Sequence, residues 1–241
     1  MNEGNNKMRN VLSHTGNTFY LGHFQGNVMK KYMDLVAEYS SKKVTISPRI
    51  SVITAFNDKT QAITALQLEL SGMPYVNACP EGTENWTNVD KIRYFVSALE
   101  QTTTEYSLLV DAYDVLFFNN LDEIFIHKFN NMGTKILYNA TKNNHPNIEI
   151  DYVENRDELG EFKYLNAGIV FGKTADLLAF YKEVLDLTTK KTIMNPWNSE
   201  QLYVRIAANG KSYVTFDHQC ILFQTFSKTV KTVCGNTVII I

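Results

Sequence analysis

A long apolar stretch in the middle of the chain runs from Tyr106 to Phe118 and is interrupted by two carboxylates, Asp111 and Asp114. Polar residues bound it on both sides. A continuous apolar run of this kind is typical of a strand that is buried on both faces of a sheet. We therefore expect a central strand of the protein in this stretch.

Segments with the periodicity of helices and strands alternate along the rest of the chain. The expected helices cover residues 28–39, 59–71, 88–99, 121–129, 175–187 and 199–208. The expected strands cover residues 50–56, 74–79, 106–118, 135–138, 162–172, 213–216 and 238–241. This order predicts an α/β fold, Rossmann-like in its first half, with a single domain built on a mixed central sheet.

The first 49 residues do not share this pattern throughout. Residues 1–25 are rich in Asn, Gly, His and Thr without periodicity, which predicts a loose arm, and the helix at 28–39 is expected to pack on the domain edge. We therefore divide the chain into an N-terminal arm with an edge helix, residues 1–49, and the α/β domain, residues 50–241. Residues 140–161 are polar and predict a long loop of the sort that often carries function.

The two carboxylates in the apolar stretch need a cation or a set of hydrogen-bond donors to offset the cost of burying their charge. An ionised carboxylate that is buried without a partner costs several kcal/mol, at least about 3. Oxygen ligands favour Mg²⁺ or Mn²⁺, which also accept phosphate oxygens. Asp111 and Asp114 therefore indicate a divalent metal site. The alternative is structural, with Asp111 at a strand end and Asp114 facing solvent in a turn.

Composition narrows the class of partner. The chain has 241 residues and a net charge of −2, and it lacks a long Lys/Arg block, so we expect neither a nucleic-acid surface nor a polybasic membrane patch. The three cysteines are widely spaced, which predicts core thiols. We expect no signal peptide and no membrane span. Two interpretations follow from this. The protein is a cytoplasmic one of bacterial or viral origin, or it is a domain excised from a longer multidomain chain.

Five motifs, in order, resemble those of the glycosyltransferase domain of the collagen lysyl hydroxylases, a GT-A fold. Asp111-Ala-Tyr-Asp114 is similar to the family's Asp-Ser-Tyr-Asp, and Asp90-Lys-Ile-Arg93 to its Gln-Lys-Val-Arg. Tyr164-Leu-Asn-Ala-Gly-Ile169 is similar to Phe-Leu-Asn-Ser-Gly-Gly, and Ser199-Glu-Gln-Leu-Tyr203 to Asp-Asp-Gln-Leu-Phe. Phe216 to Gln224 is similar to Leu-Asp-His-x-x-x-Ile-Phe-Gln.

The resemblance implies a metal-dependent hexosyltransferase. It implies transfer of glucose or galactose from UDP-glucose or UDP-galactose to hydroxylysine or galactosylhydroxylysine of a collagen-like chain, with retention of configuration. The implied cofactor is Mn²⁺ or Mg²⁺, bound by Asp111 and Asp114. The residues expected on the nucleotide-sugar side are Thr54, Phe56, Lys91, Tyr113 and Gly168. The residues expected to act on the transferred hexose are Asn166, Glu200 and Gln201, under a mobile lid formed by residues 139–161.

The sequence also departs from the family. The family's acidic run before the Gln is reduced to Glu200, and its Trp-Pro in the loop over the nucleotide sugar is His145-Pro146 here. The family's third metal ligand is a His in a His-Gly-Asn-Gly segment after a final strand. The chain given ends at Ile241 without that segment, so we expect either a ligand beyond Ile241 or a metal held by fewer ligands.

Alternatives remain open at this point. Gly168 could mark only a bulge in a strand, Glu200 could be an ordinary first-turn charge, and Asp217-His218 is more typical of a structural pair. The function could be that of a UDP-sugar-binding or scaffold module without turnover. A third class, a phosphohydrolase, normally has its aspartates at alternate positions, whereas two residues separate Asp111 from Asp114.

Overall fold

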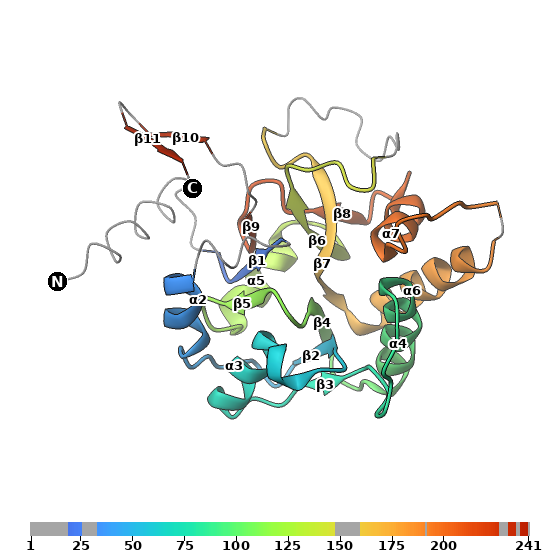
Figure 1. Cartoon of the computed structure of the whole chain (residues 1–241), viewed down its shortest axis with the longest axis horizontal. Coiled ribbons are helices and arrows are strands. Elements are labelled where there is room, and N and C mark those ends of the chain that lie inside the picture. Colours follow the sequence, from blue (N-terminus) through green and yellow to red (C-terminus); the bar gives the residue numbers. More distant parts are fainter. Residues whose placement is uncertain are drawn as a thin grey trace.

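The structure is a computed structural model that describes residues 19–25, 33–147, 160–190 and 192–226, together with the backbone of two strands at 231–234 and 237–240. Its centre is a six-stranded sheet with helices on both faces (Figure 1). None of the helices in these ranges combines the length and apolar content needed to cross a bilayer.

The central sheet has the strand order β3-β2-β4-β7-β6-β8. Its strands are β2 (Ile50–Ala55), β3 (Val76–Asn77), β4 (Tyr106–Asp111), β6 (Ile136–Thr141), β7 (Tyr164–Lys173) and β8 (Val214–Phe216). β2 runs parallel to β3 and β4, and β6 runs parallel to β8. β7 is antiparallel to both β4 and β6. The prediction of an α/β fold with one mixed central sheet is confirmed.

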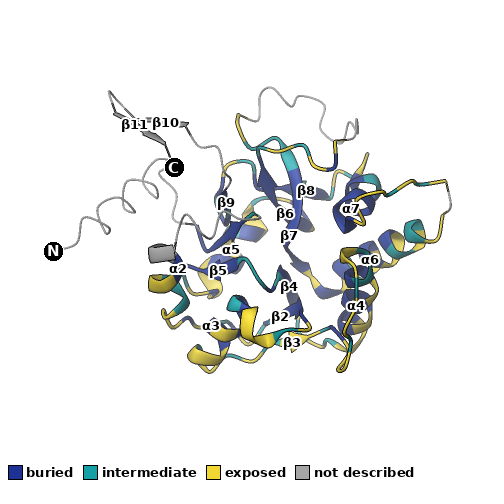
Figure 2. Ribbon diagram, viewed as in Figure 1, coloured by how far each residue is buried: buried dark blue, intermediate teal, exposed yellow. Residues whose placement is uncertain are grey.

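Side chains of the sheet alternate between two apolar layers, as the pleat of a strand requires. Ile53, Leu109 and Val170 join the layer under α4 (Asn88–Gln101), α6 (Thr174–Thr188) and α7 (Glu200–Ala208). Leu108 and Phe171 join the opposite layer, under α3 (Ile63–Ser71) and α5 (Glu123–Asn131). Figure 2 shows the resulting buried interior with exposed outer helix faces.

A second, three-stranded sheet corrects two expectations. It has the order β5-β1-β9, with β1 at Leu21–Phe24, β5 at Val115–Phe117 and β9 at Phe223–Phe226. β1 is buried between β5 and β9; it runs antiparallel to β5 and parallel to β9. Residues 21–24 are therefore not part of a loose arm. The expected single strand 106–118 is two strands, since the chain turns after Asp111 and β5 leaves the central sheet.

Smaller differences concern element ends. The edge helix is α2 (Met33–Ser40), and the expected residues 28–32 lie outside the described ranges. Asp58 caps a 3₁₀ turn, Lys59–Gln61, before α3 begins. The sequence missed β9 and also β10 (Lys231–Cys234), which pairs with β11 (Thr237–Ile240). Cys79 and Cys220 are buried free thiols, as expected.

Candidate active site

The first part of the site is the turn that joins β4 to β5. Thr64, in the first turn of α3 and fully buried, donates its hydroxyl toward the carbonyls of Asp111 (3.0 Å) and Val115 (2.7 Å), and its N–H donates to Ala112 O (3.1 Å). These bonds from one helix start fix both ends of the turn. As a result Asp111, the last residue of β4, and Asp114 lie on the same side of the turn.

The structure places His23 of β1 against these two carboxylates. Its Nε2 lies 3.3 Å from Asp114 Oδ2 and 3.8 Å from Asp111 Oδ2. One ligand atom from each of the three residues lies within 4.8 Å of the others. His23 is only 3% exposed, whereas the carboxylate side chains are about one quarter exposed, at 26% and 24%. A cation at this position would be held from the protein side and open to a ligand on the other.

Electrostatics favour charge at this cluster. Burial alone would lower the pKa of His23, but the neighbouring Asp114, then Asp111, raises it above its ordinary value. Burial would raise the pKa of Asp111, but Lys91 and His23 lower it. Each shift comes from a neighbour of opposite charge that stabilises the charged form, chiefly Asp114 for His23 and Lys91 for Asp111.

Lys91 connects this cluster to helix α7. Its Nζ contacts Asp111 Oδ1 and lies 2.6 Å from Glu200 Oε1. Burial raises the pKa of Glu200, and Lys91 only partly opposes the shift. Lys91 therefore joins Asp111 and Glu200, whereas Asp114 lies on the side of His23.

A bulge in β7 brings two further predicted residues together. β6 and β7 change register between Tyr138, which lies opposite Val170, and Asn139, which lies opposite Asn166. The bulge amides are satisfied by side chains: Asn166 Oδ1 accepts from Gly168 N (2.9 Å), and Gln201 Oε1 accepts from Ala167 N (3.0 Å).

The family profile of the PLOD GT domain, the glycosyltransferase domain of the lysyl hydroxylase and collagen glycosyltransferase family, matches residues 61–236. That range covers more than half of the chain. The chain belongs to the PLOD GT domain family. A comparison with curated proteins gives no match.

Membership confirms the resemblance read from the five motifs, and it shows that the chain is a glycosyltransferase domain. Asp111, Asp114, Lys91 and Glu200 all lie inside the range matched to the PLOD GT domain. His23 lies outside it. Sequence reasoning missed this residue because it treated residues 1–25 as unpatterned, although the apolar and aromatic run around it, Phe19-Tyr-Leu-Gly-His-Phe24, is a strand signal.

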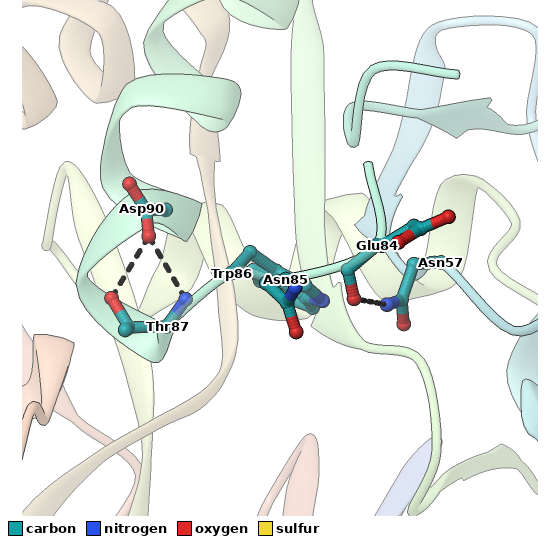
Figure 3. Close-up of a pocket in the computed structure, with 6 residues that line it drawn as sticks. All are labelled: Asn57, Glu84, Asn85, Trp86, Thr87 and Asp90. Atoms are coloured by element: carbon teal, nitrogen blue, oxygen red, sulfur yellow. Dashed lines mark hydrogen bonds between the residues drawn. The ribbon is translucent and has the colours of Figure 1, made fainter. Parts of the chain in front are cut away.

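Tyr113, between the two aspartates, hydrogen-bonds to Asn57, which lines a pocket of about 330 Å³ beyond the end of β2. The Tyr113 hydroxyl donates to Asn57 Oδ1 (3.1 Å) and accepts from Asn57 N (3.2 Å). Figure 3 shows the other side of the pocket, where Asp90 accepts two bonds from Thr87 at the start of α4. The lining residues are Asn57, Glu84, Asn85, Trp86, Thr87 and Asp90.

The remaining predicted nucleotide residues lie deeper. Thr54 is fully buried in β2, and Phe56 is 6% exposed and packs against Ala62, Ala65 and Ala112. The backbone N–H and C=O of Phe56 both bond to the side chain of Asn77. Phe56 therefore belongs to the apolar cluster against which Tyr113 packs, and Thr54 lies inside the sheet opposite Val110 of β4.

The predicted lid is in part a fixed segment. Asn139 to Thr141 belong to β6, so the lid does not begin at residue 139, and residues 148–159 lie outside the described ranges. Between them, α7 holds the chain: Gln201 Nε2 donates to His145 O, and Arg205 Nη1 donates to Pro146 O (2.7 Å). Arg205, which is fully buried, was not predicted from the sequence.

Proposed function

We propose that this domain transfers a hexose, glucose or galactose, from UDP-glucose or UDP-galactose with the help of a divalent cation bound by His23, Asp111 and Asp114. The observation that carries the proposal is the convergence of these three side chains within 4.8 Å in a glycosyltransferase domain. The cation is Mn²⁺ or Mg²⁺.

The donor set fits such a cation. Carboxylate oxygens suit Mg²⁺ and Mn²⁺, and a neutral imidazole is a common metal ligand. Lys91 supports the same conclusion, because it lowers the pKa of Asp111 and so favours the ionised carboxylate that a cation needs. When bound, the cation would supply Lewis-acid stabilisation of the diphosphate leaving group.

The residues of the chain bind and orient. Tyr113 and the pocket lined by Asn57 are proposed to hold the nucleoside, together with Thr54 and Phe56. Lys91 orients Asp111 by holding Oδ1, which leaves Oδ2 on the side of His23. Glu200, joined to Lys91, is proposed to act on the transferred hexose.

The same proposal extends to the hexose and to the acceptor. Asn166 and Gln201, whose side chains accept N–H groups of the β7 bulge, are proposed to contact the transferred hexose, and Gly168 the nucleotide sugar. The acceptor is a hydroxylysine, or a galactosylhydroxylysine, of a collagen-like polypeptide, and transfer proceeds with retention. Membership of the PLOD GT domain family supports this choice of acceptor.

The experiment is a measurement of UDP release and of glycosylated product, using UDP-glucose or UDP-galactose with a hydroxylysine-containing collagen peptide. We expect turnover with Mn²⁺ that stops on chelation. His23→Ala should remove it. His127→Ala is the matched control, because His127 is an exposed histidine on α5.

Two other results would each favour a different function. Binding of UDP-sugar by calorimetry without release of UDP under any metal condition would indicate a binding or scaffold module. Release of phosphate from phosphomonoesters without sugar transfer would indicate a phosphohydrolase. Activity that survives both chelation and His23→Ala would contradict the metal role.

A further inference from the structure

The side of His23 that faces away from the carboxylates is also built from buried polar groups. Its Nδ1 lies 3.3 Å from the side-chain amide of Asn139, in β6. Asn139 is fully buried, and the same amide group lies 2.9 Å from Thr225 Oγ1 in β9, which is 2% exposed. The imidazole thus has carboxylates at Nε2 and one carboxamide at Nδ1.

This arrangement decides which proton form of His23 can bind a metal. Nε2 is the nitrogen that faces Asp111 and Asp114, so a cation shared by the three residues would be bound through Nε2. A neutral imidazole that ligates through Nε2 carries its proton on Nδ1. That proton points at the amide of Asn139 and needs an acceptor there.

The amide as placed offers its Nδ2 donor to Nδ1, and its buried Oδ1 has no hydrogen-bond partner among the described residues. No described contact therefore holds Oδ1 in that position. The two ends of a carboxamide have nearly the same shape, so their assignment follows from the hydrogen-bond network. With the amide turned over, Oδ1 accepts from Nδ1 of His23 and from the hydroxyl of Thr225.

We propose that Asn139 is a positioning residue of the metal site, whose Oδ1 accepts the Nδ1 proton of His23 and so keeps Nε2 free as a ligand. This inference rests on the proposed metal-dependent function. It assigns to β6 and β9 a part in metal binding, although neither strand contributes a ligand.

The first test measures Mn²⁺ affinity by EPR titration of the free ion. Asn139→Leu keeps the approximate size of the side chain but removes the acceptor, and it should weaken Mn²⁺ binding by about 10-fold or more, the usual effect of losing such a partner. Asn139→Asp keeps an acceptor and should bind Mn²⁺ at least as tightly as wild type. Asn131→Leu is the matched control, because Asn131 makes the same kind of contact with His127 Nδ1 (3.2 Å) on the exposed face of α5.

The second test needs no variant. Two-bond ¹H–¹⁵N spectra of the Mg²⁺-loaded wild-type protein should show the proton of His23 on Nδ1. A proton on Nε2 of His23 in the Mg²⁺-loaded protein would overturn the inference. An Asn139→Leu variant whose Mn²⁺ affinity is within twofold of wild type would overturn it as well. Equal losses in the Leu and Asp variants would also overturn it, since they would indicate packing alone. Failure of wild type to bind either ion would instead refute the metal in the proposed function.

Discussion

A Cβ atom added to Gly168 would lie 2.5 Å from Cε1 of His23 and 2.8 Å from both of its ring nitrogens. Gly168 is buried in the bulge of β7, and the ring of His23 fills the space that a side chain would occupy. The glycine was expected to let a ligand approach the strand. In the structure it lets a histidine from another sheet approach.

Gly168→Ala is therefore expected to displace the His23 ring and to weaken Mn²⁺ binding by at least about 10-fold, because second-sphere changes that misplace a ligand have effects of this size. EPR titration measures the affinity, and thermal melting shows whether the domain still folds. Normal Mn²⁺ affinity in a folded Gly168→Ala protein would show that the contact with His23 does not matter for the metal.

Asp111→Ala is expected to abolish turnover and the metal dependence of UDP binding. The change removes a carboxylate that faces His23 through one oxygen and Lys91 through the other. Calorimetry of UDP binding with Mn²⁺ and with a chelator provides the measurement. The three samples to compare are the variant, wild type with Mn²⁺ and wild type with the chelator. Equally tight UDP binding in all three would rule out a metal bridge to the phosphates.

Variants of Glu200 and Gln201 should distinguish a role in sugar transfer from a role in the stability of the fold. Among the ion pairs of the described chain, Glu200 takes part only in the one with Lys91. If Glu200 acts on the hexose, Glu200→Gln should cut sugar transfer by about 10²-fold or more, which is roughly 2.7 kcal/mol of transition-state stabilisation. The affinity for UDP should be almost unchanged. The measurement is kcat and KM for transfer together with UDP affinity.

Gln201→Ala should also lower transfer, and in addition the melting temperature, because it leaves the buried N–H of Ala167 without its acceptor and frees the carbonyl of His145. Gln201→Glu keeps an acceptor for Ala167 but removes the N–H donor to His145 O and buries a charge, so it should not restore the melting temperature. A loss of melting temperature in Glu200→Gln with normal activity of the folded fraction would instead assign Glu200 to structure.

The sequence predicted the central sheet and its helices because their signals are local. Apolar periodicity and β-branched runs identified β2, β4, β7 and α4, and the Asp111/Asp114 pair lies in one such run. The third possible ligand could not be found in this way. His23 lies 88 residues from Asp111 along the chain and reaches it only because β1 inserts between β5 and β9.

The role of polar residues in the bulge was also out of reach from the sequence. Asn166 and Gln201 were predicted around the hexose from their motifs, and the structure adds that both accept backbone N–H groups of β7. Gly168 gave a signal for the bulge, because a glycine inside a strand often marks one, but it does not indicate which side chains accept the N–H groups there. The proposed roles of Asn166 and Gln201 at the sugar remain predictions that the variants above will test.

The last prediction concerns Asp217, which supports β1 from a distance. Asp217 is fully buried, and its carboxylate accepts the backbone N–H groups of Ile221 (2.9 Å), Leu222 (2.6 Å) and Phe223 (2.8 Å). These bonds shape the turn that enters β9. Leu222 O then accepts from Tyr20 N (2.8 Å) at the start of β1.

Asp217→Ala would leave two buried N–H groups and one partly buried N–H group without an acceptor, at a cost of about 1–3 kcal/mol each. For a domain of this size, about 1 kcal/mol shifts the melting temperature by roughly 2–4 °C, so we expect a fall of roughly 6 °C or more. Asp217→Asn retains one oxygen and should fall less, and His218→Ala, at the half-buried neighbouring position, should change little. Because β9 pairs with β1, Mn²⁺ affinity should fall together with stability in Asp217→Ala. A destabilised Asp217→Ala protein that binds Mn²⁺ as wild type does would show that β1 holds His23 in place without support from this turn.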